Sequence, residues 1–96
     1  MEHIYTITTI DNKKVPDCRC VGFYFNVDVA KQEVLNNSGD IFEFSYTYCV
    51  IEEVGEGIYY YPRKEFWFKW NYEEKKYVAL ETKPERFNNI GGFGIG

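Results

Sequence analysis

Cys18, Cys20, Cys49 and His3 are the side chains of this sequence best suited to binding a transition metal. Together they form a Cys3His set, which is one of the ligand sets of structural zinc. If the chain forms a hairpin about residues 11–17, however, His3 lies at the far end of that hairpin from Cys18 and Cys20. At about 3.3 Å per residue the separation is roughly 10 Å or more, too far for one coordination sphere. We therefore expect free thiols and no metal.

The cysteines also lack what a catalytic nucleophile needs. A thiol becomes a thiolate at neutral pH when a base or a positive charge lies beside it. Arg19 lies between Cys18 and Cys20 in the sequence, but side chains alternate across a strand, so we expect Arg19 on the opposite face. The sequence therefore predicts no catalytic cysteine.

Three glutamates lie beside a glycine-rich turn. Glu52, Glu53 and Glu56 flank Gly55 and Gly57, and paired carboxylates act as general acid and base when their environments separate their pKa values. The sequence supplies neither an apolar pocket nor a partner for them. We expect a solvated rim of the turn, and we do not expect an enzyme.

The last six residues, GGFGIG, contain four glycines and no charge. Glycine loops that bind phosphate lie between a strand and the N-terminus of a helix, and no helix follows here. We therefore expect no cofactor. Residues 91–96 are expected to be either a flexible tail or a segment held by Phe93 and Ile95.

Aromatic and basic residues are interleaved in residues 59–70, YYYPRKEFWFKW. Such a stretch can stack the bases of single-stranded nucleic acid, form a protein-binding surface, or simply pack into the core. Strand alternation directs every second aromatic residue to the core and leaves Trp67 and Lys69 outward. The formal net charge of −4 favours protein over nucleic acid as the partner. The candidate protein-binding residues are Tyr60, Arg63, Trp67 and Lys69.

The strands that position these residues follow from hydrophobic alternation. They are predicted over residues 3–10, 18–25, 41–54, 65–72 and 77–81, with a short aromatic run at 58–61. The longest, residues 41–54, is predicted to be the central strand. The first two form a hairpin in which Cys18 and Cys20 lie opposite Ile10 and Thr8.

One helix is predicted between the second and third strands. Asn26 or Asp28 can cap its start, and Gly39 is expected to end it in a left-handed conformation. Its apolar stripe consists of Val27, Ala30 and Val34. A single helical turn is expected at residues 84–88. The fold class is α+β: a mostly antiparallel sheet of about five strands in β-β-α-β-β-β order, with one helix packed on one face.

The 96 residues predict a single globular domain over residues 1–96. No run approaches the roughly 20 apolar residues that cross a bilayer, and the first residues lack a signal-peptide pattern. Three cysteines, an odd number, fit a reducing compartment. We therefore expect a cytoplasmic protein that contacts neither a membrane nor nucleic acid.

Five short motifs lie within residues 57–96. They are Gly57-Ile58-Tyr59, residues 67–70 (WFKW), Lys76-Tyr77-Val78, Lys83-Pro84-Glu85 and residues 93–96 (FGIG). In these motifs the chain resembles a group of uncharacterised bacterial and phage proteins of unknown function. The resemblance implies a domain that stands alone in the cytoplasm, and it carries no catalytic signature or site residues.

Two functions of different classes are compatible with these patterns. The first is a non-catalytic protein-interaction domain, of phage or mobile-element origin, that binds another protein or itself through an aromatic face or an open strand edge. The second is a small-molecule-binding protein or enzyme with a pocket between helix and sheet, lined by tyrosines and by Glu43 or Glu53.

Overall fold

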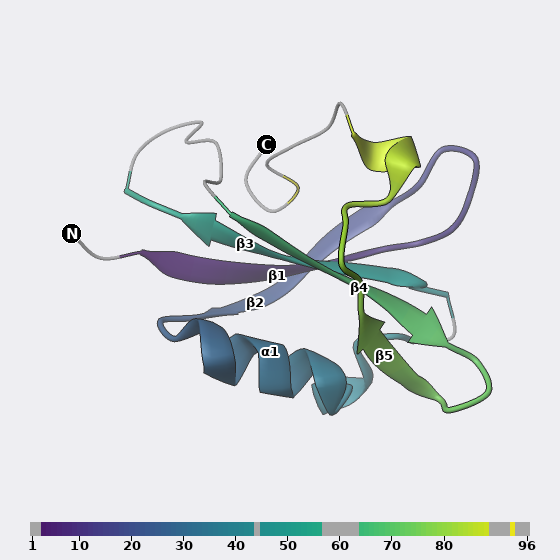
Figure 1. The fold of residues 1–96 in the computed structure, drawn as a ribbon, viewed down its shortest axis with the longest axis horizontal. Coiled ribbons are helices and arrows are strands. Elements are labelled where there is room, and N and C mark those ends of the chain that lie inside the picture. Colours follow the sequence, from purple (N-terminus) through teal and green to yellow (C-terminus); the bar gives the residue numbers. More distant parts are fainter. Residues whose placement is uncertain (1–2, 44, 57–63, 89–92, 94–96) are drawn as a thin grey trace.

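A twisted antiparallel sheet forms the centre of the computed structural model, which describes residues 3–43, 45–56, 64–88 and 93 (Figure 1). Its strands are β1 (Ile4–Ile10), β2 (Cys18–Tyr24), β3 (Tyr48–Val54), β4 (Glu65–Asn71) and β5 (Lys76–Ala79). The spatial order is β2-β1-β3-β4-β5, so β3 is the central strand, as predicted. The predicted α+β class is confirmed. The short aromatic run at residues 58–61 lies outside the described residues.

The hairpin of β1 and β2 has the predicted register. Cys18 lies opposite Ile10 and Cys20 lies opposite Thr8. The register shifts by one residue between Ile7 and Thr8, which leaves Val21 as the extra residue of a β-bulge on β2.

The third strand is shorter than predicted, because residues 41–43 and 45 form a turn and β3 begins only at Tyr48. The Tyr46 N–H donates to the carbonyl of Phe42 at 2.9 Å, and Glu43 has a positive φ of 45°. The Phe42 ring stacks on Trp70, with 4.0 Å between centroids and 4° between planes. The alternation of aromatic residues here therefore reflects packing of a turn onto the sheet, and the expectation of a strand over residues 41–47 was wrong.

Helix α1 (Val27–Leu35) begins as the sequence predicts. The Asn26 side chain accepts hydrogen bonds from the N–H groups of Asp28 and Val29, and Ala30 is buried against the sheet. The helix ends before Asn37, which is left-handed, and Gly39 lies within the following 3-10 turn η1 (Ser38–Asp40). Among the described residues, no helix is long and apolar enough to cross a membrane.

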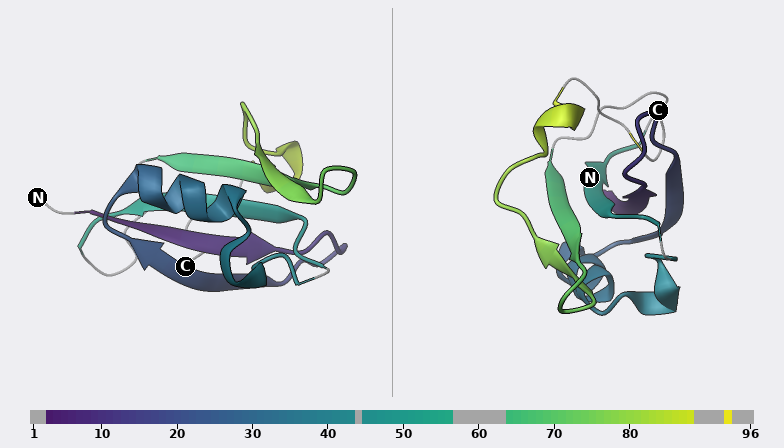
Figure 2. Two further views of the ribbon diagram at one scale, coloured as in Figure 1. Left: turned by 90° about the horizontal axis from the view of Figure 1, so that it is seen from below. Right: turned by 90° about the vertical axis from the view of Figure 1, so that its right-hand side faces the viewer.

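Helix α1 lies over one side of the sheet (Figure 2), and each face of the sheet carries its own apolar core. On one face, α1 packs over a cluster that includes Ile51, Phe68 and Trp70. After β5, the chain crosses to the other face and forms the 3-10 turn η2 (Glu85–Phe87), near the predicted helical turn. Buried there are Ile10, Val50, Trp67 and Phe87, with Phe93 packed against them.

We predict that Phe42→Ala destabilises the protein far more than Phe23→Ala. Phe42 is 8% exposed and stacks on Trp70, whereas Phe23 is 54% exposed. Removing a buried phenylalanine ring costs about 3–5 kcal/mol, and removing an exposed one about 1 kcal/mol or less. Urea unfolding followed by tryptophan fluorescence measures both; equal losses would contradict the packing of the turn that contains Phe42.

Candidate functional site

Two of the four predicted binding residues lie on β4, and the other two, Tyr60 and Arg63, lie outside the described residues. Lys69 is exposed, as expected, with its ammonium 5.8 Å from the centre of the Tyr48 ring. Trp67 was expected to face solvent, and this was wrong, since it is 3% exposed.

The burial of Trp67 has a clear physical cause. Strand alternation does place it on the face opposite α1, but η2 covers that face. Its indole stacks on Phe87, with 5.3 Å between ring centroids, and its Nε1 donates to the Glu65 carboxylate at 3.1 Å. Trp67 therefore belongs to the second core and contributes to a surface site only through its backbone.

The glutamates near the turn are also more buried than predicted. Glu52 is fully buried and Glu53 is 8% exposed, so the expected solvated rim is wrong for both; Glu56 is exposed. Glu52 accepts from the Phe93 N–H at 3.1 Å, and Glu53 accepts from the Tyr5 hydroxyl at 3.4 Å. Because consecutive residues of a strand point to opposite faces, Glu52 and Glu53 do not form an acid/base pair.

The Glu53 carboxylate affects the pKa of its hydrogen-bond partner, Tyr5. Desolvation raises the pKa of the Tyr5 hydroxyl, and the neighbouring Glu53 carboxylate raises it further. Tyr5 therefore stays protonated and donates its hydrogen bond. The contact stabilises the end of the β1–β3 pair, where the two residues lie opposite one another.

The cysteines are separated by the sheet. Cys18 and Cys20 are exposed on β2, whereas Cys49 is buried in the core beneath α1. Arg19 pairs with Glu43 at 2.6 Å. Burial raises the pKa of the Cys49 thiol, and burial followed by the Asp11 charge raises that of Cys18. Within the described part of the chain, no group of three His, Cys, Asp or Glu side chains could hold a metal ion.

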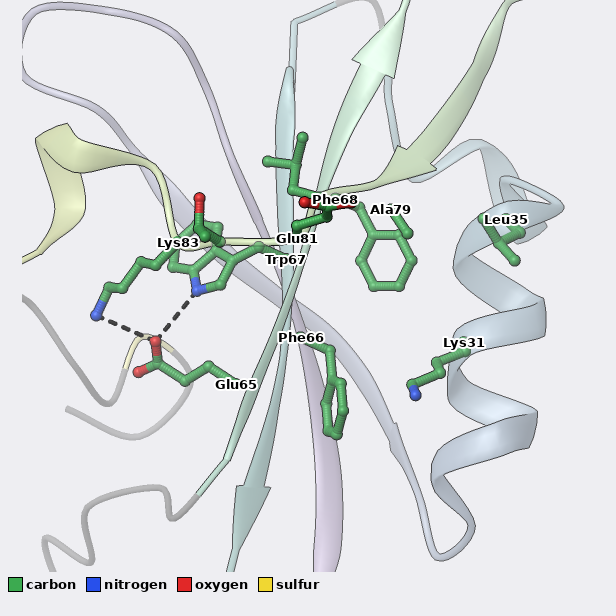
Figure 3. Close-up of a pocket in the computed structure, with 11 residues that line it drawn as sticks. Lys31, Leu35, Glu65, Phe66, Trp67, Phe68, Ala79, Glu81 and Lys83 are labelled. Carbon is green, nitrogen blue, oxygen red and sulfur yellow. Dashed lines mark hydrogen bonds and ion pairs between the residues drawn. The ribbon is translucent and has the colours of Figure 1, made fainter.

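A pocket of about 310 Å³ lies between α1 and the outer edge of β4 (Figure 3). Its walls are Lys31 and Leu35 of α1, residues 65–68 of β4, and residues 79–83 that follow β5. The Lys31 ammonium lies 4.1 Å from the centre of the Phe66 ring. This lining differs from the expected tyrosines with Glu43 or Glu53: Glu43 pairs with Arg19, and Glu53 contacts Tyr5.

Beside this pocket, β4 extends beyond the end of β5. The ladder between them covers Phe68 to Asn71, and one further bond runs from the Leu80 N–H to the Trp67 carbonyl at 2.8 Å. The Lys64 carbonyl accepts from the Glu53 N–H, so it points towards β3. Since the two polar groups of a trans peptide point in opposite directions, the Glu65 N–H points away from β3, into the opening.

By the same alternation, the Glu65 carbonyl and the Trp67 N–H also face outward. None of the hydrogen bonds found among the described residues uses these three backbone groups. The sequence could not reveal this edge, because it depends on where β5 stops relative to β4.

Comparisons of the chain with models of protein families, with curated proteins and with solved structures find no match. The structure thus has an open strand edge beside a pocket with an apolar wall, two lysines, Lys31 and Lys83, and two glutamates, Glu65 and Glu81. Such a site can pair with an extended backbone and receive one of its side chains.

We predict that two of the three thiols react with Ellman's reagent in the folded protein and that the third reacts only after unfolding. Cys20 should react faster than Cys18, because a raised pKa lowers the thiolate fraction of Cys18. Cys18→Ser should retain the faster phase, and Cys49→Ala should give two thiols under both conditions. Rapid reaction of all three in the folded wild type would contradict the burial of Cys49.

Proposed function

We propose that this protein is a non-catalytic interaction domain that binds an extended segment of a partner protein along the open edge of β4. The observation that carries the proposal is the unequal length of β4 and β5, which leaves residues 65–67 of β4 without a partner strand on the side away from β3 among the described residues. The pocket of about 310 Å³ beside that edge gives the partner's side chain a place to pack.

Strand addition suits this edge for a simple reason. An open edge presents N–H and C=O groups at the spacing of an extended chain, so a peptide gains hydrogen bonds without any change in the sheet. The two end strands of the sheet, β5 and β2, are less suitable. β5 has four residues, and β2 is interrupted by its bulge at Val21.

Tyr60 and Arg63 remain candidate binding residues, since they immediately precede β4 in the sequence. Lys69 is exposed on the same strand. A second copy of this chain is another occupant that the same edge could accept, and the experiment below separates it from a different protein. The odd number of cysteines supports a cytoplasmic location, and a bacterial or phage origin rests on the resemblance alone.

The pocket volume also supports a second candidate, a small-molecule-binding protein. A volume of about 310 Å³ is at the small end of the range of ligand sites. A small ligand would use the pocket without the backbone edge, so its binding would not depend on the N–H of Glu65. Thermal shift against a metabolite panel detects this case.

We predict that Glu65→Pro prevents peptide binding and that Glu65→Ala does not. Proline removes the outward N–H and places its ring where the partner strand would lie, while the bonds to β3 are kept. Alanine loses the same side-chain contacts to Trp67 and Lys83 but keeps the N–H. Loss of one hydrogen bond of about 1 kcal/mol weakens binding about fivefold, and the ring weakens it further.

The measurement is selection of random twelve-residue peptides displayed on phage against each immobilised variant, with circular dichroism to verify the fold. Wild type and Glu65→Ala should enrich a common set of peptides, and Glu65→Pro should not. Equal enrichment by Glu65→Pro would overturn strand addition at β4. Sedimentation of the free wild-type protein tests the second copy, since a dimer abolished by Glu65→Pro would assign the edge to self-association.

A further inference from the structure

We infer that the bound segment carries an acidic side chain, glutamate or aspartate, which pairs with Lys31 of α1 at the position opposite Phe66. This inference rests on the proposed function, because it names the chemistry of the segment that would add to β4. It follows from the place of Lys31 in the pocket and from the alternation of side chains along an added strand.

Lys31 occupies the wall of the pocket without an acidic partner among the described residues. Its ammonium lies over the Phe66 ring at 4.1 Å, and no described carboxylate lies within 4.0 Å of it. Figure 3 shows the lysine reaching from α1 towards Phe66. A cation held against an aromatic face in a partly enclosed site is available to a carboxylate that approaches from the open side.

The geometry of strand addition brings one residue of the segment to this lysine. Side chains of neighbouring strands that lie opposite one another share a face of the sheet. Phe66 and Phe68 face α1, and so does the residue of an added strand opposite Phe66. The residue opposite Phe68 is already Ala79 of β5, so only one position of the segment reaches the pocket from this direction.

The apolar part of the lining suits the stem of an acidic side chain, and Glu81 also lines the pocket. Leu35, Phe66 and Phe68 give an apolar wall against which methylene groups can pack, and Lys31 stands at its rim. On the opposite face, the Glu65 carboxylate already pairs with Lys83 at 3.1 Å. The neighbouring residues of the segment, which point to that face, therefore meet no comparable donor for a carboxylate among the described residues.

The overall charge of the protein distinguishes an acidic preference at one position from a general effect of charge. With a formal net charge of −4, the protein attracts basic peptides and repels acidic ones at long range. A selection governed by net charge would therefore enrich Lys and Arg at many positions. Enrichment of Glu or Asp at one fixed position requires a local cation. Of the two lysines that line the pocket, Lys83 pairs with Glu65, and Lys31 pairs with no carboxylate among the described residues.

The test is the same phage selection with a reversed charge at this site. Lys31→Glu should change the preferred residue at the fixed position from Glu or Asp to Lys or Arg, and Lys31→Met should remove the preference. Lys14→Glu is the matched control, because Lys14 is exposed in the loop between β1 and β2, and it should select as the wild type does. A synthetic peptide selected by the wild type should bind Lys31→Glu at least about tenfold more weakly.

The possible results separate the inference from the function on which it rests. Two results would overturn the pairing with Lys31 and leave strand addition intact. In the first, the selected peptides need the Glu65 N–H but share no acidic residue at a fixed position. In the second, they bind Lys31→Glu as tightly as they bind the wild type. Absence of any enriched peptide would overturn both. If Lys14→Glu weakened binding of the selected peptide as much as Lys31→Glu does, the effect would come from net charge. That result would overturn the pairing of the acidic residue with Lys31.

Discussion

Strand β3 is paired along both edges and covered on both faces, and the positions of the other elements follow from this double burial. Cys49 and Ile51 point towards α1, while Val50 points towards η2 and Phe93. A strand of this kind exposes apolar surface to water unless something covers each side. The chain meets the requirement with one helix after β2 and with the segment after β5.

Glu52 shows how the second face is held together. A fully buried carboxylate on the central strand would be costly without hydrogen bonds, and the Phe93 N–H supplies one of them. The same residue packs its ring against Trp67, edge to face at 5.4 Å. A charged group and an aromatic group thus place one residue of the glycine-rich end of the chain, and together they close the core around Trp67.

The sequence predicted the elements well where a local interaction determines them. Alternation located β1, β2, β4 and β5, turn residues gave the register of the first hairpin, and the two candidate caps, Asn26 and Asp28, marked the start of α1, of which Asn26 is the cap. The same alternation misled at residues 41–47, because Phe42 reaches the core from a turn and only its long-range stacking on Trp70 distinguishes the two cases.

The candidate site was predictable only in part, for the same reason. Alternation assigns residues 65–70 to two faces of a strand, but it cannot tell whether the second face is covered by water or by η2. Trp67 lies on that second face, so it was predicted to be exposed and is buried. Lys31 was not singled out at all. Its meeting with Phe66 joins residues that are 35 positions apart, and a single sequence carries no local signal for such a contact.

The bulge at Val21 affects the behaviour of this sheet at high concentration. A continuous outer strand can pair with copies of itself, one after another, and this is how sheets grow into fibres. On β2 the extra residue breaks the regular spacing of backbone groups, although Phe23 and Phe25 are exposed beside it. The bulge therefore disfavours edge-to-edge stacking at the outer strand that carries an exposed aromatic ring, Phe23.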